Sequence, residues 1–369
     1  MNSTSFAETA DSPSTRQSIV GLQYLRGLAA LMVVFHHARG YFPGDSFLQT
    51  AAWSEWGSRG VDIFFVISGF VMVHSTQGYA PGLPRASQAV AFLVKRVIRV
   101  VPLYWIATLW TAKWLIFRGE AGLDLARDFL FVPHYADHGH GMIWPYLFQG
   151  WTINYEMFFY LLFALSMLIG RLRHIGLSLC LVGLTLLGVV ATLTHAQHNV
   201  AAVLFYTSNL LFEFLLGVWL SLWMKRHPIE LPRAGLACIA LAGIALLAIP
   251  NPDTVRGFAD GIIAAIIVWS SVLWGAGTKI NLLRELGDAS YSIYLFHLSI
   301  YGVASWLFRS LGLVAPTLFN IVVVIPLYLV LASVFGVVVH HLIEKPVLRT
   351  LHGLSSRAKA PIQRAAPLP

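Results

Sequence analysis

The sequence predicts an all-α membrane protein, a polytopic bundle of about ten transmembrane helices with both termini in the cytoplasm. Hydrophobic residues make up 57% of the 369-residue chain and charged residues only 11%, and the mean hydropathy is +0.69. Soluble domains carry about a quarter charged residues, so this composition excludes an ordinary soluble enzyme. The apolar residues fall in runs near the length that crosses a bilayer as a helix. Because backbone groups in lipid must be hydrogen-bonded internally, these runs are expected to be helices.

The chain is expected to form one membrane domain between two polar tails. Residues 1–18 are rich in Ser and Thr and lack the basic-then-apolar order of a signal peptide. Residues 19–346 are the transmembrane domain, and residues 347–369 are a basic cytoplasmic tail. The expected spans are 19–38, 61–76, 97–117, 152–169, 175–194, 203–224, 234–250, 257–275, 289–308 and 317–343.

The distribution of basic residues sets the orientation. Most of the 25 lysines and arginines fall in segments that alternating spans place on one side of the membrane. Positively charged loops stay in the cytoplasm, so both termini are expected inside. The formal charge of +8 then belongs mainly to the inner face. Topology alone explains it, and an anionic cytosolic ligand is the alternative explanation. We expect membrane lipid as surroundings and no nucleic-acid partner.

The first apolar run contains RGLAALMVVFHHA, which opens with Arg26 and closes with two histidines. Arg26 and His37 are close to three full helical turns apart, so they share one face and lie about 16 Å apart along the axis. His36 points about 80° away from Arg26. Ionisable groups that face a bundle interior are costly and are commonly functional. In the competing interpretation, Arg26 snorkels at the inner interface and His37 lies among the outer headgroups.

Two carboxylates interrupt later apolar runs. Asp62 begins GVDIFFVISGF, in which the Ser-Gly pair favours close helix packing. Its expected partner is either Arg59 or His37. Glu156 lies within QGWTINYEMFFY, where an unpaired carboxylate would be costly. Glu156 is therefore either a structural hydrogen-bonding group or a partner of His37.

Basic residues cluster in KRVIRVVPLYW at the start of the third expected span. Arg96 and Arg99 are three residues apart on one helix face, with Lys95 nearby. Guanidinium groups bind phosphates through paired hydrogen bonds, which suits an anionic cofactor. A positive-inside cluster explains these residues equally well. Pro102 either kinks this helix or occupies its first turn.

The long outer loop, from about residue 118 to residue 150, contains His134, His138 and His140. Neither a cysteine nor a nearby pair of carboxylates supports a metal site there, and we expect no metal.

The ninth expected span begins DASYSIYLFH. Tyr291, Tyr294 and His297 recur every three residues and face one side of that helix. Both a packing role and a place in a site are open for this face.

The order of these segments resembles the acyltransferase 3 family of integral membrane acyltransferases, and most closely its short exopolysaccharide O-acetyltransferases. RGLAALMVVFHHA, GVDIFFVISGF, KRVIRVVP, WTINYEMFFY, YSIYLFH and IEKP follow one another, each at a helix start or end. The resemblance runs from about residue 22 to residue 348 and covers nearly the whole chain.

The resemblance implies transfer of an acyl group, usually acetyl, from cytosolic acyl-CoA to a hydroxyl of a surface or secreted glycan. It implies that Arg26 and His37 are the essential pair of the first helix. The family's Arg-x-x-Arg element falls on Arg96 and Arg99. The Trp-to-Glu segment of the fourth helix ends at Glu156, although a threonine stands where a serine is more often seen.

The expected enzyme is an acyl-CoA-dependent O-acyltransferase of the bacterial inner membrane. Its co-substrate is acetyl-CoA, and its acceptor is a polysaccharide or lipid-linked glycan. His37 acts as general base or as transient acyl acceptor. Glu156 or Asp62 orients the imidazole of His37. Four basic residues are expected to hold the donor: Arg26, Lys95, Arg96 and Arg99.

A proton-coupled transporter of a small substrate is the alternative, because charges inside a helical bundle also suit substrate movement. The sequence shows no internal repeat and no obvious pair of broken helices to support it. A non-catalytic subunit of a polysaccharide machine is a third interpretation, which the joint presence of the arginines and His37 disfavours.

Overall fold

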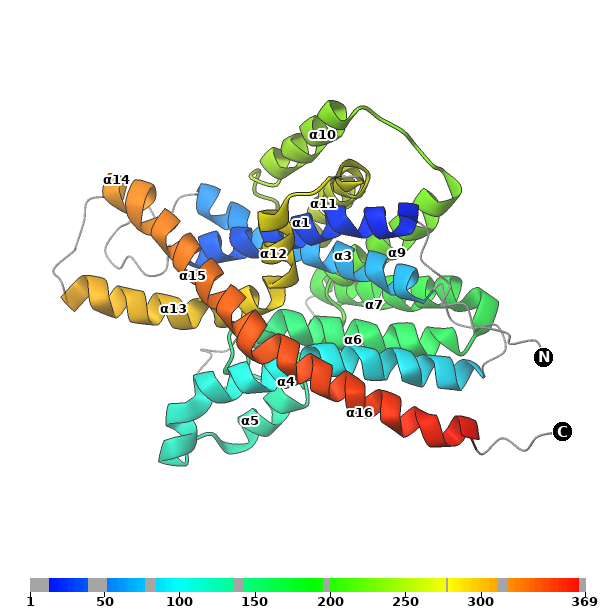
Figure 1. Ribbon diagram of the computed structural model, residues 1–369, viewed down its shortest axis with the longest axis horizontal. Helices are drawn as coiled ribbons and strands as arrows, with labels where there is room; N and C mark the ends of the chain where they lie inside the picture. The colour runs from blue at the N-terminus through cyan, green and yellow to red at the C-terminus, as the bar shows by residue number, and fades with distance from the viewer. Residues whose placement is uncertain are drawn as a thin grey trace, which may run out of the picture.

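The computed structural model describes residues 13–38, 52–76, 84–135, 142–194, 200–276, 278–310 and 317–364. Every regular element in these ranges is helical (Figure 1), as the all-α prediction requires. The helices at the predicted spans are α1 (Pro13–Ala38), α3 (Gly60–Ser75), α4 (Arg85–Arg118), α6 (Gly150–Met167), α7 (Arg173–Leu193), α8 (Ala201–Tyr206) with α9 (Leu211–Arg226), α10 (Arg233–Leu246), α11 (Asp253–Gly275), α13 (Ser290–Ser310), and α14 (Thr317–Phe319) with α15 (Ile325–Val339). Shorter or flanking elements are η2 (Ala52–Arg59), α5 (Gly122–Phe129), η3 (Gly170–Leu172), α12 (Asn281–Asp288), η4 (Asn320–Val324), η5 (His340–Glu344) and α16 (Lys345–Arg364).

Five stretches of the described chain are long and apolar enough to cross a membrane. They are Glu55–Ser75, Gly170–Leu193, Ala201–Arg226, Val255–Gly275 and Asn320–Leu354. Their burial within the protein differs widely: the first is 72% buried and the second, which contains α7, only 17%. The first therefore packs inside the bundle, while α7 presents most of its apolar surface outward, as a lipid-facing helix would. The number of ten spans stays a prediction.

The start of α4 differs from the sequence expectation. α4 begins at Arg85 rather than near residue 97, because its first turns are less apolar than a membrane span yet still helical. Arg96 and Arg99 are therefore inside a long helix instead of at its start. Pro102 also lies inside α4, so the first-turn alternative for this proline is wrong.

Close packing of α3 against α9 fixes one wall of the bundle. A Cβ added to Gly69 would lie 2.0 Å from the carbonyl oxygen of Phe214, and one added to Gly217 would lie 2.0 Å from that of Val66. Neither position has room for a side chain. The close-packing interpretation of the Ser-Gly pair is thus confirmed for its glycine, as small residues at helix contacts allow.

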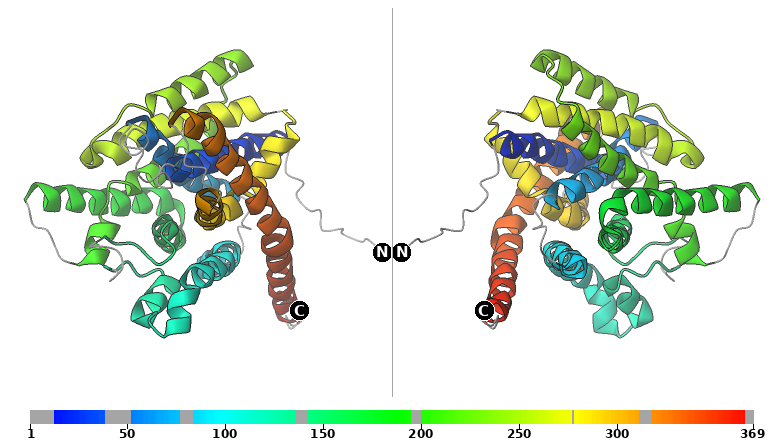
Figure 2. Two further views of the ribbon diagram at one scale, coloured as in Figure 1. Left: turned by 90° about the vertical axis from the view of Figure 1, so that its left-hand side faces the viewer. Right: turned by 90° about the vertical axis from the view of Figure 1, so that its right-hand side faces the viewer.

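The helices that surround the candidate site are α1, α3, α4, α6 and α13. Gly27 of α1 lies against Gly287, near the end of α12, and His37 at the end of α1 lies against His297 of α13. α1 begins and α16 ends on the same side of the bundle (Figure 1). α10 and α5 form opposite edges, and the end of α16 stands away from the other helices (Figure 2).

Candidate functional site

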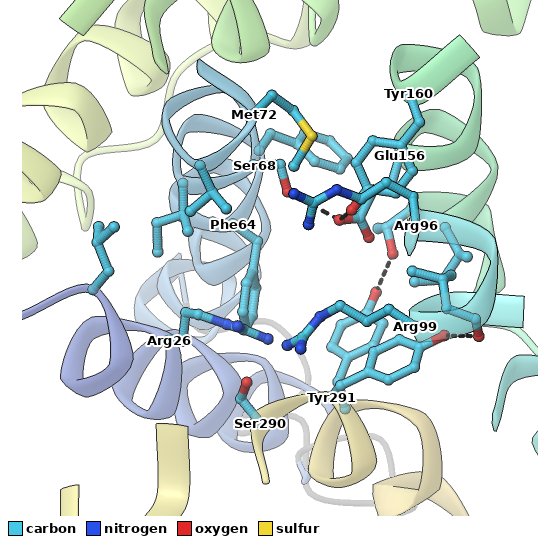
Figure 3. A pocket seen from close by; sticks show the side chains of 18 of the residues that line it. Arg26, Phe64, Ser68, Met72, Arg96, Arg99, Glu156, Tyr160, Ser290 and Tyr291 are labelled. Carbon is cyan, nitrogen blue, oxygen red and sulfur yellow. Dashed lines mark hydrogen bonds between the residues drawn. The ribbon is translucent and has the colours of Figure 1, made fainter. Parts of the chain in front are cut away.

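A cavity of about 520 Å³ lies among these five helices (Figure 3). Its lining mixes apolar side chains such as Phe64 and Met72 with polar and charged groups. The exposed Ser75, at the end of α3, is one of its lining residues, so the cavity reaches the protein surface there. In the predicted orientation this end of α3 faces the cytoplasm. The charged groups of the lining are Arg26, Arg96, Arg99 and Glu156.

Arg26 and Arg99 enter the cavity from different helices. Figure 3 shows their guanidinium groups pointing toward each other from α1 and α4. Two cations that face one another across a cavity repel each other, and an anion between them removes that repulsion. This arrangement is typical of a site that accepts phosphate or carboxylate groups.

Arg96 lies on the same face of α4, nearer the rim. Its Nη2 donates a hydrogen bond to Ser75 Oγ at 2.7 Å. Its guanidinium carbon lies 5.4 Å from the ring centre of Phe92 and 5.8 Å from that of Tyr160. These contacts hold the side chain in place at the rim of the cavity. Lys95 is exposed and does not line the cavity.

Glu156 is the one carboxylate among the described residues that line the cavity. Its Oε1 accepts hydrogen bonds from Ser68 Oγ, at 3.1 Å, and from the hydroxyl of Tyr160 (Figure 3). Three arginines against one carboxylate leave the cavity with a formal charge of 3 − 1 = +2. The site is therefore electrostatically suited to a polyanionic ligand.

His37 lies outside this cavity, about 16 Å along α1 from Arg26. Its Nδ1 is 2.9 Å from the carbonyl oxygen of Val33 and 3.3 Å from Nε2 of His297. The neighbouring His36 turns elsewhere, and its Nδ1 lies 3.9 Å from a carboxylate oxygen of Glu55. The two histidines thus point in different directions, as the helix geometry predicts.

The carboxylates expected beside His37 lie elsewhere, which corrects the sequence-based assignment. Asp62 is fully buried and accepts hydrogen bonds at 3.1 and 2.8 Å from Arg256, instead of pairing with Arg59 or His37. Arg59 pairs with Asp260 at 3.0 Å. Glu156 is bound to Ser68 and Tyr160, as described above. Pairing between helices depends on the bundle arrangement, which spacing along the chain does not encode.

The residue that sequence reasoning missed as a partner of His37 is His297. The signal was present, because Tyr291, Tyr294 and His297 share one face of α13. Tyr291 donates to the carbonyl oxygen of Val100 at 2.8 Å. The Tyr294 hydroxyl lies 2.7 Å from Thr152 Oγ1. Tyr294 also packs beside His297, with ring centres 6.1 Å apart, so this face joins the cavity to the His37 side.

The outer-loop histidines give no metal site in the described part of the chain. His134 Nε2 lies 3.4 Å from Asp124 and 3.9 Å from Asp128, and no group of three potential ligands is arranged to hold a metal ion within the described ranges. His138 and His140 lie outside the described residues.

These features define the class: a helical membrane protein with a cationic cavity at one end of its first helix and a paired imidazole at the other. The acyltransferase domain family matches residues 19–341, and the chain belongs to this family, acyltransferase 3. This membership favours acyl transfer over the transporter alternative.

Three relatives illustrate the similarity. The exopolysaccharide production protein ExoZ of Rhizobium meliloti (strain 1021) is 33% identical over 79% of this chain and 90% of its own length. The putative membrane-bound transacylase BcsY of Komagataeibacter xylinus is 28% identical over 77% and 73%, respectively. The O-acetyltransferase OatA of Staphylococcus aureus (strain NCTC 8325 / PS 47) is 26% identical over 76% of this chain and 50% of its own. No solved structure matches the chain.

Proposed function

We propose that this membrane acyltransferase moves an acetyl group from cytosolic acetyl-CoA to a hydroxyl of a surface polysaccharide or lipid-linked glycan, in the bacterial inner membrane. One observation carries the donor assignment: among the described residues, three arginines and a single carboxylate line a cavity that opens at the predicted cytoplasmic end of α3. The acceptor class is suggested by relatives named for exopolysaccharide production and O-acetylation.

The donor phosphates would contact Arg96 and Arg99 through charge-assisted hydrogen bonds. The narrow pantetheine arm would extend past Arg26 along α1, so that the thioester approaches His37. Lys95, being exposed, would contribute only long-range attraction. The cavity thereby separates binding of the polyanion from the chemical step at the other end of α1.

In the chemical step, His37 removes the proton of the acceptor hydroxyl, and the resulting oxygen attacks the thioester carbonyl. A C–O ester bond forms and the C–S bond breaks. The proton taken up by His37 finally neutralises the departing thiolate. His37 serves equally well as a transient acyl acceptor, in which case the imidazole attacks the thioester first and the hydroxyl then takes the acyl group.

The test measures ester-linked acetate on the surface polysaccharide of a host strain that lacks its own copy. The strain carries the wild-type chain, His37→Ala or His36→Ala at matched membrane expression. We expect acetate with the wild type and His36→Ala, and at least a hundredfold loss with His37→Ala, as expected when a general base is removed. Equal loss in both variants, or equal acetate in all three strains, would contradict the proposed role of His37.

A further inference from the structure

The second imidazole of the His37 pair has a fixed environment. His297 is 1% exposed. Its Nδ1 lies 2.7 Å from the backbone carbonyl oxygen of Tyr294, and its Nε2 faces His37 Nδ1 at 3.3 Å. The two rings are tilted by 54° with their centres 5.0 Å apart. The contact is therefore a directed hydrogen bond between nitrogens, not a stack of parallel rings.

The carbonyl oxygens around the pair determine where the protons lie. A carbonyl oxygen only accepts, so Nδ1 of His297 must carry the proton that Tyr294 receives. In the neutral ring, Nε2 of His297 is then an acceptor. Nδ1 of His37 faces two acceptors, this nitrogen and the carbonyl oxygen of Val33, and must itself carry a proton. The lone pair of His37 is consequently on Nε2.

We propose that His297 is a positioning residue for acyl transfer, which together with the carbonyl oxygen of Val33 holds His37 in the Nδ1-protonated tautomer and presents Nε2 as its reactive nitrogen. This inference rests on the proposed function. In the other tautomer, the lone pairs of His37 Nδ1, His297 Nε2 and the Val33 carbonyl oxygen would face one another without a proton between them, which is unfavourable in a partly buried site. A histidine partner is also compatible with burial here, because it fixes the tautomer without adding a charge.

His297→Leu and His297→Gln test the assignment. Leucine fills similar space and offers no acceptor, whereas the side-chain oxygen of glutamine reaches the place of Nε2. Tyr301→Phe is the matched control, because Tyr301 is a buried residue of α13 that touches the His297 ring and donates to the carbonyl oxygen of Val34. It removes a buried hydrogen bond between the same two helices but leaves the His37–His297 contact intact.

Two measurements are made on the full-length chain. Nitrogen-15 NMR of histidine-labelled protein in lipid nanodiscs, without donor, reports the tautomer of His37, whose signals are assigned by their loss in His37→Ala. Ester-linked acetate on the polysaccharide reports transfer. Binding of labelled acetyl-CoA, whose proposed site does not include His297, should stay within about threefold of wild type in every variant.

We expect a single Nδ1-protonated His37 in the wild type, a smaller Nδ1-protonated fraction in His297→Leu, where the carbonyl oxygen of Val33 still accepts from Nδ1, and the wild-type tautomer again in His297→Gln. Transfer should fall about 10- to 100-fold in His297→Leu, as when other orienting partners are lost, and recover largely in His297→Gln. An Nε2-protonated His37, undiminished transfer in His297→Leu, or an equal loss in Tyr301→Phe would overturn the proposal. If the wild-type chain itself forms no acetate ester, the proposed function fails, and the NMR result shows separately whether His297 sets the tautomer.

Discussion

Two regions of the bundle place arginines among its helices, and they differ in the balance between arginines and carboxylates. The paired network joins α3, α9, α11 and the end of η2, and consists of Arg59, Asp62, Glu213, Arg256 and Asp260. The cavity contains Arg26, Arg96, Arg99 and Glu156. In the network, two arginines meet three carboxylates. In the cavity, three arginines meet one.

The difference separates a structural role from a binding role. A buried arginine with a carboxylate partner ties helices together, and its charge is already neutralised. Arginines in excess of carboxylates, around a cavity that reaches the surface, are stabilised when an anion enters. The presence of an ionisable residue in an apolar segment therefore does not define a ligand site. The balance of charge around it does.

The largest expected effect is on folding, from the network. Asp62→Ala leaves the partly buried Arg256 guanidinium without its bidentate partner and should reduce the free energy of unfolding by about 3 kcal/mol. Arg99→Ala, in the cavity, relieves repulsion with Arg26 and should leave stability within about 1 kcal/mol. Thermal and denaturant unfolding in the same detergent compare the two variants. Equal destabilisation by both would show that the cavity arginines are as structural as the network.

The next effect is on donor binding. Arg96→Ala and Arg99→Ala should each weaken acetyl-CoA binding about 10- to 100-fold, since a hydrogen bond to a charged group contributes about 1.5–3 kcal/mol. Lys95→Ala is the control on the same helix, and its exposed charge should matter less than about threefold. Binding of labelled acetyl-CoA to purified protein measures all three. An affinity that responds to Lys95 as strongly as to the arginines would point to a general surface attraction.

Glu156→Gln tests the cavity charge balance from the opposite side. The amide oxygen can still accept from Ser68 and Tyr160, while the only described carboxylate of the lining is removed. Donor affinity should rise a few-fold at low salt, because attraction of the polyanion increases, and the gain should shrink as ionic strength grows. Weaker binding in Glu156→Gln would mean that this carboxylate contacts the donor directly.

The sequence predicts those features of the site that depend on a single helix. The common face of Arg26 and His37 follows from the helical repeat, and so does the divergence of His36. The shared face of Arg96 and Arg99 follows in the same way. In each case, the helical repeat of 3.6 residues per turn is sufficient to predict which side chains share a face.

The remaining features depend on contacts between distant segments. Asp62 and Arg256 are 194 residues apart, and His37 and His297 are 260 apart. Which helices become neighbours is decided by packing of the whole bundle, and hydrophobic runs of similar composition do not specify it. The recurrence of Tyr291, Tyr294 and His297 every three residues is a local indication that this face of α13 contributes to a site.

The last expected effect, confined to one pH range, extends the comparison to a buried carboxylate outside the membrane spans. Asp128, in α5, is 1% exposed and has a histidine rather than an arginine nearby, with His134 Nε2 3.9 Å away. The backbone N–H of Tyr146 donates to its Oδ2 at 2.8 Å. Burial raises the pKa of Asp128 to about 6, so the folded state favours the neutral carboxyl.

A raised carboxyl pKa makes stability depend on pH in a definite direction. The stabilising contribution of Asp128 to the free energy of unfolding is fully present below the pKa of this carboxyl in the unfolded chain, near 3.8. It is lost as the pH rises through about 6, the pKa in the folded protein. Asp128→Asn should therefore match the wild type near pH 4 and exceed its free energy of unfolding by about 1–3 kcal/mol above pH 7. Unfolding midpoints across this pH range give the measurement. If the wild type and Asp128→Asn lose the same free energy of unfolding between pH 4 and pH 7, the prediction is wrong. The cost of burying the ionised carboxyl would then be offset by the hydrogen bond from Tyr146 and by His134.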